Sequence, residues 1–225
     1  MVIADLIARN LTTIREEIRQ ACVQTGRDPR AIRIIAVTKT QDHEVLEILR
    51  RLGIADFGEN RMEHLLEMQG ASQPGDTWHF IGRIQSRQLP GIADHCSVVH
   101  SLCDEEHIRK LARASQALGR PAQIFLQVNV SGETAKAGVA PNSVGRIVEL
   151  ARAAGGLDVV GLMTMAPDVR TGTDMATIRD CFVRLRELAS NNGLNRLSMG
   201  MSGDYRIAVE EGATDVRIGS SLFHS

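Results

Sequence analysis

The amino-acid sequence predicts an α/β protein in which eight parallel strands close into a (β/α)₈ barrel of the TIM type, with an extra helix at the N-terminus. Eight short apolar runs alternate with helical patterns, and parallel neighbours need such long crossover connections. Eight units in 225 residues match the lower end of the size range of this fold. The alternative is a doubly wound open sheet, but no GxGxxG motif follows the first apolar run and no Walker motif occurs.

An amphipathic helix is predicted at the start of the chain. Its apolar residues recur at helical spacing, and the pattern ends at Gly26, with Pro29 blocking any continuation. The stripe consists of Ile3, Leu6, Ile7, Leu11, Ile14 and Ile18. Because the chain stops a few residues after the eighth apolar run, the last outer helix is expected to be missing or minimal. We expect the N-terminal helix to cover the barrel flank that is left open there.

The eight runs are mostly apolar without alternation, which is typical of strands buried on both faces. They are IRIIAV at 32–37, IADFG at 54–58, TWHFIG at 77–82, SVVHSL at 97–102, QIFLQVNV at 123–130, VVGLMTM at 159–165, RLSMGM at 196–201 and DVRIGS at 215–220. Two helices between them have clear apolar faces, Ile108, Leu111, Ala112 and Leu118 in segment 104–119 and Ile178, Phe182, Leu185 and Ala189 in segment 174–193. No linker interrupts the pattern, so residues 1–225 are predicted to form one domain.

Charge and composition argue against several classes of protein. The chain has 26 basic and 27 acidic residues, so it lacks the excess of positive charge that is typical of a nucleic-acid-binding protein. No window offers the roughly 20 apolar residues that a transmembrane helix needs, and the start lacks the pattern of a signal peptide. The sequence therefore predicts a cytoplasmic protein whose partners are small molecules.

The cysteines predict neither a disulfide framework nor a metal site. They stand without a CxxC pair, as is usual for reduced thiols. His95, Cys96, His100 and Cys103 are the one cluster that suggests a metal, but they straddle a strand whose successive residues face opposite ways. We therefore expect no metal site.

Polar and glycine-rich residues stand at the C-terminal ends of several strands, where barrel proteins place their sites. GMSG at 200–203 follows the seventh run and IGSS at 218–221 overlaps the end of the eighth. Glycine lets backbone N–H groups approach an anion, and the hydroxyls of Ser202 and Ser220 add donors. The two loops predict a phosphate site; the alternative is that they are ordinary turns in which Ser202 caps a helix.

Lysine stands only at positions 39, 110 and 136, in a chain whose other basic residues are all arginine. Lys39 follows the first strand, and an amine can form an imine, which a guanidinium cannot. Lys39 opposite a phosphate site predicts a ligand with an aldehyde and a phosphate, which describes pyridoxal 5′-phosphate (PLP). The alternative is a solvated lysine at a strand end.

Three further residues are candidates for the ligand ring. Arg217 faces the barrel interior and either pairs with Glu59 or a neighbouring carboxylate, or donates to a ring nitrogen of the ligand, which would restrain carbanion chemistry. His79 either contacts the ligand or belongs to the core. Asn60 either donates to the phenolic oxygen or caps the helix that begins at Arg61.

Several motifs in order resemble one family. They are AVTK at 36–39, FGEN at 57–60, WHFIG at 78–82, QVN at 127–129, GLMT at 161–164, LSMGMS at 197–202 and VRIGSSLF at 216–223. Over essentially its whole length the sequence resembles the YggS/PROSC-like pyridoxal phosphate homeostasis proteins. The resemblance implies a fold-type III barrel similar to the N-terminal domain of alanine racemase, with PLP as a Schiff base on Lys39.

The same resemblance implies the other contacts and the function. Asn60, Met199, Ser202, Gly219 and Ser220 would line the cofactor, with Arg217 at the pyridine nitrogen. A monomeric carrier or buffer of PLP is implied, which supplies PLP-dependent apoenzymes without a turnover of its own. One departure is Arg87-Gln88, where the family has an Asn-Lys pair, so no role of that pair carries over. Lys136 matches a family lysine, but we assign no second PLP site to it.

Two alternative functions remain at this point. An amino-acid racemase needs a second base, and the only tyrosine is Tyr205, with no second domain to supply another. A lysine-dependent aldolase would use the same rim of the barrel with a sugar phosphate.

Overall fold

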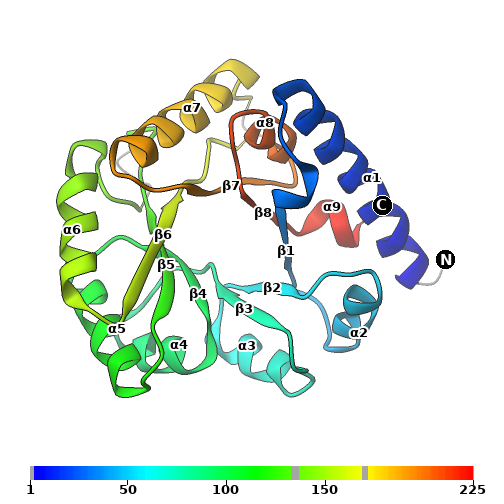
Figure 1. Ribbon diagram of the computed structural model, residues 1–225. Helices are drawn as coiled ribbons and strands as arrows, with labels where there is room; N and C mark the ends of the chain where they lie inside the picture. Colours follow the sequence, from blue (N-terminus) through cyan, green and yellow to red (C-terminus); the bar gives the residue numbers. More distant parts are fainter. Residues whose placement is uncertain (1–2, 133–136, 169–171, 225) are drawn as a thin grey trace.

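Eight parallel strands form a closed barrel in the computed structural model, which describes residues 3–132, 137–168 and 172–224 (Figure 1). The strands are β1 (Arg33–Val37), β2 (Asp56–Glu59), β3 (Thr77–Phe80), β4 (Val98–Leu102), β5 (Ala122–Gln127), β6 (Leu157–Met163), β7 (Arg196–Met201) and β8 (Asp215–Ile218). β8 pairs with β1 in parallel, with Ile35 beside Arg217, and this pairing closes the barrel. The predicted barrel is confirmed, and the open sheet is wrong.

Helices surround the barrel on the outside (Figure 1). They are α1 (Ile3–Thr25), α2 (Glu44–Arg51), α3 (Met62–Gln69), α4 (Leu89–His95), α5 (Glu105–Ala117), α6 (Val144–Ala154), α7 (Met175–Asn191), α8 (Tyr205–Glu210) and α9 (Ser220–Phe223). Three short 3₁₀ turns are Pro29–Ala31, Ser86–Gln88 and Pro141–Ser143.

The N-terminal helix covers the flank where the last outer helix is short. α9 has 4 residues, and α1 lies against α8 and α9 (Figure 1). The amide of Asn10 on α1 donates to the carbonyls of Leu222 (3.1 Å) and His224 (3.0 Å). The prediction that α1 covers this flank is confirmed.

The predicted helical faces are largely confirmed, with two exceptions at helix ends. α5 begins behind Asp104, whose carboxylate accepts from the backbone N–H of His107 (3.0 Å). Leu118 was expected on the buried face, but it lies at the C-cap and its side chain is 42% exposed. Ile3 is 49% exposed at the start of α1. Both residues lie where a helix extends beyond the core that its other apolar residues contact.

Side chains that point into the barrel form a layer separate from the main core. Val98, Phe125 and Met163 form their own small apolar cluster. The ring of His100 stacks on Phe125 with centroids 4.5 Å apart. Polar side chains therefore share the barrel interior with aromatic and aliphatic ones.

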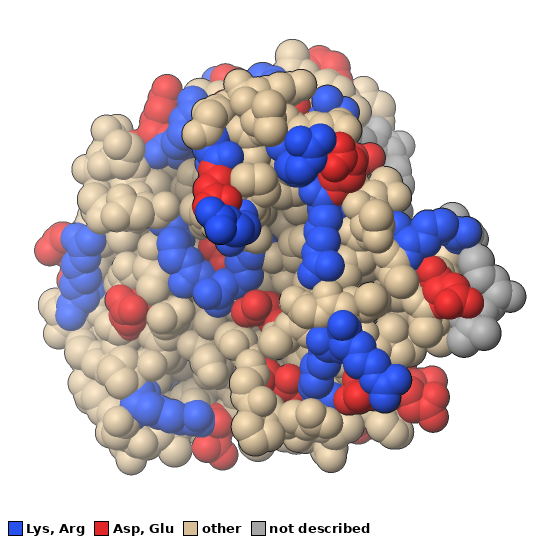
Figure 2. All heavy atoms as spheres, turned by 45° about the vertical axis from the view of Figure 1, so that its right-hand side comes forward, with Lys and Arg blue, Asp and Glu red and all other residues tan. Residues whose placement is uncertain are grey.

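Basic and acidic side chains are interspersed over the surface drawn in Figure 2. Many pair within one helix, such as Arg19 with Glu16 (2.7 Å) and Arg51 with Glu47 (3.0 Å). Among the described residues, no helix has the length and apolar character that crossing a bilayer requires.

Candidate functional site

Lys39 lies in the turn directly after β1, at the C-terminal mouth of the barrel, and it is exposed there. Alternate residues of a strand share a face, so Ile35 and Val37 lie in one row of β1, and Lys39 follows in the turn. Ile35 pairs with Arg217 of β8, which points into the interior, and the missing Cβ of Gly219 would lie 3.5 Å from Val37 Cβ. Arg217 therefore faces the barrel interior beside this row, and Lys39 and Gly219 follow the ends of the two paired strands.

The loops after β7 and β8 meet at Ser202. Its hydroxyl oxygen accepts from the backbone N–H groups of Gly219 (3.3 Å) and Ser221 (3.1 Å), and the Ser221 hydroxyl donates to the Ser202 carbonyl (3.1 Å). Two backbone amides thus converge on one oxygen atom, next to the exposed Ser220. This donor set suits an anion, because each amide offers a proton to an oxygen in the same place.

The turn after β7 is built tightly around Gly200. Its φ is +93°, which favours glycine, and an added Cβ would lie 2.6 Å from Ala208 Cβ. The buried Asp204 carboxylate accepts from the backbone N–H of Met201 (2.5 Å). Burial raises the pKa of Asp204. This turn holds Ser202 against the β8 loop.

Arg217 lies in the interior of the barrel with its side chain almost fully buried. It donates from Nη1 to Ser198 Oγ (2.6 Å) and from Nη2 to the carbonyl of Thr164 (3.0 Å). Burial lowers its pKa to about 10, while Asp204 and Asp215 act in the opposite direction. Arg217 therefore stays cationic at neutral pH, with further N–H groups left for a ligand.

Glu59 is not the partner of Arg217, so this part of the alternative for Arg217 is wrong. The buried Glu59 carboxylate accepts from the Thr38 hydroxyl (2.5 Å) and lies 2.9 Å from His64 Nδ1. His64 Nε2 lies 3.1 Å from the carbonyl of Gln41. Both oxygens that face the imidazole are acceptors, so the protonated ring satisfies both. The cluster fixes the loop that carries Lys39 to β2 and α3.

The family is shown by the sequence relatives. The model of the alanine racemase N-terminal domain matches residues 6–225. The chain is 39% identical over 221 residues to the pyridoxal phosphate homeostasis protein of Pseudomonas aeruginosa, covering 96% of this chain and 94% of that protein. The chain belongs to the family of pyridoxal phosphate homeostasis proteins. The mouse homeostasis protein is 32% identical over 232 residues, with 95% and 84% covered.

Solved structures agree with this family. PipY of Synechococcus elongatus, solved with PLP bound, has a TM-score of 0.83 at 29% identity and covers 96% of this chain and 99% of that one. An alanine racemase of Clostridium difficile has a TM-score of 0.76 at 15% identity and covers 97% and 56%. The racemase shares the fold alone, and this chain matches only about half of it.

The structure places His79 and Met199, two candidates for contact with the ligand, in the interior of the molecule. His79 is buried deep in the barrel, and its ring nitrogens face His100 Nε2 (2.9 Å) and Asp56 Oδ1 (3.0 Å). Met199 is fully buried in the core between the strands and the helices. Both nitrogens of His79 are engaged and Met199 faces outward, so neither side chain joins the group at the mouth.

Asn60 follows β2 at the mouth and is half-buried. It does not cap α3, because the residue at the N-cap is Arg61. The backbone of Asn60 lies so close to Gly82 that a Cβ on Gly82 would stand 2.1 Å from the Asn60 carbonyl oxygen. The backbone of Asn60 is therefore held by the end of β3.

The remaining candidates lie away from the mouth or outside the described residues. Lys110 pairs with Glu106 (2.5 Å) on α5, on the outside of the barrel. Lys136 lies outside the described residues. Arg87 and Gln88 lie in a short turn, in which the backbone N–H of Gln85 donates to the Gln88 side chain (3.1 Å).

The cluster that suggested a metal does not converge in the structure. His95 lies at the end of α4 with Nδ1 2.8 Å from the Gln69 side-chain oxygen, while His100 points into the barrel. Within the described part of the chain, no three His, Cys, Asp or Glu side chains gather as metal ligands would.

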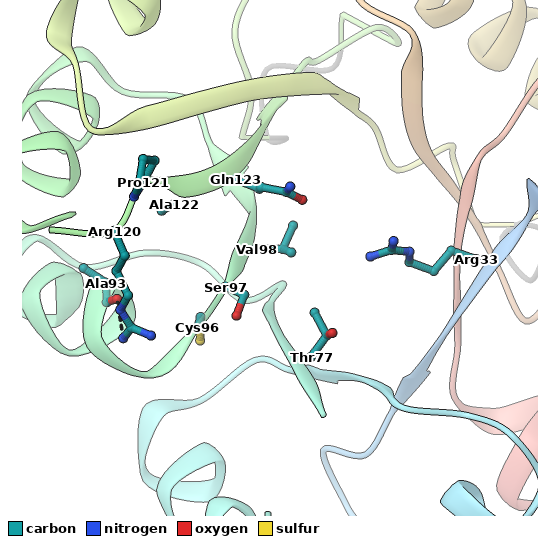
Figure 3. A pocket seen from close by; sticks show the side chains of 10 residues that line it. All are labelled: Arg33, Thr77, Ala93, Cys96, Ser97, Val98, Arg120, Pro121, Ala122 and Gln123. Carbon is teal, nitrogen blue, oxygen red and sulfur yellow. Dashed lines mark hydrogen bonds between the residues drawn. The ribbon is translucent and has the colours of Figure 1, made fainter. Parts of the chain in front are cut away.

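A cleft lies at the opposite, N-terminal end of the barrel. It has a volume of about 350 Å³, and Arg33 and Gln123 reach toward it from opposite sides (Figure 3). None of its lining residues is a lysine, so this cleft offers no amine for an imine. Sequence reasoning missed this cleft, and it also missed Ser198 and Thr164 as the partners of Arg217. The polar side chain of Ser198 in an otherwise apolar strand was the available signal, whereas Thr164 contributes only its backbone carbonyl, which leaves no signal in the sequence.

Proposed function

We propose that this protein binds PLP as a Schiff base on Lys39 and works as a cytoplasmic carrier that supplies the cofactor to PLP-dependent apoenzymes. The observation that carries the proposal is the placement of one exposed lysine, in the turn after β1, at the same end of the barrel as the amide pair of Gly219 and Ser221 after the neighbouring strand β8. An aldehyde and a phosphate on one ligand fit these two ends. Bound PLP supplies an electron-accepting ring.

The residues at the mouth would hold the cofactor at three places. Ser202, Gly219 and Ser220 would bind the phosphate, with the Ser202 hydroxyl either shifting aside or donating to it. Arg217 would donate to the pyridine nitrogen, and Asn60 would contact the ring substituents. Because a guanidinium keeps its protons, Arg217 would leave that nitrogen unprotonated and weaken the ring as an electron sink. A carrier without turnover is consistent with such a ring.

The structure gives no support to a racemase. The second base of a racemase must reach the substrate, but the Tyr205 hydroxyl donates to Glu17 on α1, on the outer side of the barrel. Burial and the Glu17 carboxylate raise the pKa of Tyr205. We therefore propose that the protein acts as a monomeric carrier rather than as an enzyme.

Visible absorbance after incubation with PLP tests the proposal. The wild-type protein is expected to develop the absorbance band of a protonated imine, and Lys39→Ala is expected to lose it with an unchanged melting temperature. Lys110→Ala is the control and should behave as wild type. A band that survives in Lys39→Ala overturns the assignment.

Two assays separate the carrier from the alternatives. The loaded protein should restore the activity of a PLP-dependent apoenzyme, and it should not interconvert D- and L-amino acids faster than Lys39→Ala does. Racemization that depends on Lys39 would contradict the carrier without turnover. A borohydride-reduced lysine adduct that forms with a sugar phosphate aldehyde but not with PLP would favour the aldolase.

A further inference from the structure

A line of hydrogen bonds crosses the barrel interior beneath Arg217. Arg217 Nη1 lies 2.6 Å from Ser198 Oγ, which lies 2.7 Å from His100 Nδ1. His100 Nε2 lies 2.9 Å from His79 Nδ1, and His79 Nε2 lies 3.0 Å from Asp56 Oδ1. Asp56 is the first residue of β2, at the end of the barrel opposite to Lys39. Five side chains therefore connect the two ends.

The donors along this line can point in only one direction when both rings are neutral. The Asp56 carboxylate offers only acceptor oxygens, so His79 carries its ring proton on Nε2 and donates to it. His79 Nδ1 is then an acceptor, and His100 donates to it from Nε2. His100 Nδ1 is in turn an acceptor for the Ser198 hydroxyl, whose oxygen accepts from Arg217, because a guanidinium has no acceptor. Each polar atom in the line is satisfied.

Burial favours these neutral rings. Ser198, His100 and His79 are all 0% exposed. Burial lowers the pKa of both histidines, and for His100 nearby positive groups, including Arg217 and Arg196, act in the same direction. For His79, the carboxylates of Asp56 and Asp215 act in the opposite direction, and Arg33 adds to the lowering. A charged imidazole would have to be stabilised in an interior that already holds a guanidinium.

The Asp56 end of the line lies next to the cleft at the N-terminal end of the barrel. Asp56 pairs with Arg33 (3.3 Å), and its side chain is 25% exposed. Arg33 lines the cleft of Figure 3 together with Thr77 and Gln123. The carboxylate that ends the line therefore keeps contact with solvent and with a cationic partner, and it offers an acceptor oxygen to the last N–H group.

We propose that Arg217, Ser198, His100, His79 and Asp56 form a directed hydrogen-bond relay that orients the Arg217 guanidinium at the ring-nitrogen side of the cofactor and anchors it to a carboxylate at the far end of the barrel. Ser198, His100, His79 and Asp56 are positioning residues, because they act through Arg217. The statement about the cofactor rests on the proposed function. The direction of the relay is a property of the ligand-free protein.

The ligand-free protein gives the first test. Long-range ¹H–¹⁵N correlation spectra of histidine-labelled protein report the tautomer of each ring, with signals assigned through His79→Gln and His100→Gln. We expect both rings to be neutral at pH 7 with the proton on Nε2. A proton on Nδ1, or an imidazolium, at either ring overturns the relay whether or not PLP binds.

The second test removes one hydroxyl. Ser198→Ala leaves the Arg217 Nη1 donor and His100 Nδ1 without this partner, so we expect PLP to bind about tenfold more weakly, with a shifted visible absorption maximum. Ser115→Ala is the matched control, because the Ser115 hydroxyl is also buried but has no hydrogen-bond partner among the described residues. It should leave affinity and spectrum unchanged.

The outcomes separate the relay from the proposed function. If Ser198→Ala binds PLP with the affinity and spectrum of Ser115→Ala, Arg217 does not depend on the relay and the inference is wrong. If wild-type protein forms no imine with PLP, the proposed function fails, and the tautomers in the ligand-free protein still decide whether the relay exists.

Discussion

Gly82→Ala tests how the site depends on the contact between the ends of β2 and β3. A Cβ at position 82 would lie 2.1 Å from the Asn60 carbonyl oxygen and 2.6 Å from its carbonyl carbon. Contacts below 3.0 Å force a shift, so the two backbones must separate by about 0.9 Å or more. The carbonyl of Gly82 is held from the other side by the Ser101 hydroxyl (2.5 Å), which leaves little room to move.

Such overpacking costs about 1 to 3 kcal/mol of the free energy of unfolding. For a chain of this length the melting temperature falls by about 2 to 4 °C per kcal/mol, so we expect a decrease of about 2 to 12 °C. PLP should also bind more weakly, since the displaced backbone carries Asn60. Thermal melts and PLP titration measure both effects.

Gly91→Ala is the matched control. Its Cβ would meet only the flexible end of Met62 at 3.3 Å, and alanine favours the α4 helix. We expect Gly91→Ala to melt at or above the wild-type temperature and to bind PLP as wild type. If Gly82→Ala behaved as this control does, the close approach at Asn60 would not constrain the site.

Two further predictions concern the contact of Glu59 with His64 at the Lys39 loop and the apolar core between the barrel and its helices. Partial burial lowers the pKa of His64, but the hydrogen bond to the Glu59 carboxylate raises it, and the pKa of His64 is raised overall. The ion pair of His64 with Glu59 should therefore stabilise the fold fully below pH 6.5, and this contribution should disappear as the pH rises through the raised pKa of His64. Denaturant titrations of wild type and His64→Gln should then converge at high pH. A difference in the free energy of unfolding that grows with pH would refute this ion pair. Phe182→Ala should lower the free energy of unfolding by about 3 to 5 kcal/mol, because its ring is fully buried, whereas Leu118→Ala, at an exposed helix end, should cost about 0.5 kcal/mol or less in the same titration. Equal losses in these two variants would contradict the assignment of the core.

The fold could be predicted because each of its elements leaves a local pattern. Apolar runs without alternation marked strands buried on both faces, and the stripe from Ile7 to Ile18 marked the helix that covers the open flank. The exposed Leu118 was missed because helical spacing does not reveal where the neighbouring layer ends. Strand parity did place Arg217 inside the barrel correctly.

The partners of Arg217 could not be predicted, because strand register in a closed barrel decides which residues lie at the same height. Glu59 was one alternative partner of Arg217, yet Ser198 and Thr164 reach the guanidinium instead. His79 was left between the ligand and the core, and its buried ring lies 3.0 Å from Asp56 Oδ1.

Borohydride reduction of the protein loaded with PLP, followed by peptide mapping, tests the central claim most directly. Reduction makes the bond between the cofactor and its lysine permanent, so the modified residue can be located. We predict the pyridoxyl group on Lys39 in the wild-type protein and in Lys110→Ala, and none in Lys39→Ala. An adduct on Lys110 or Lys136 alone, or on no lysine, would contradict the assignment of the site.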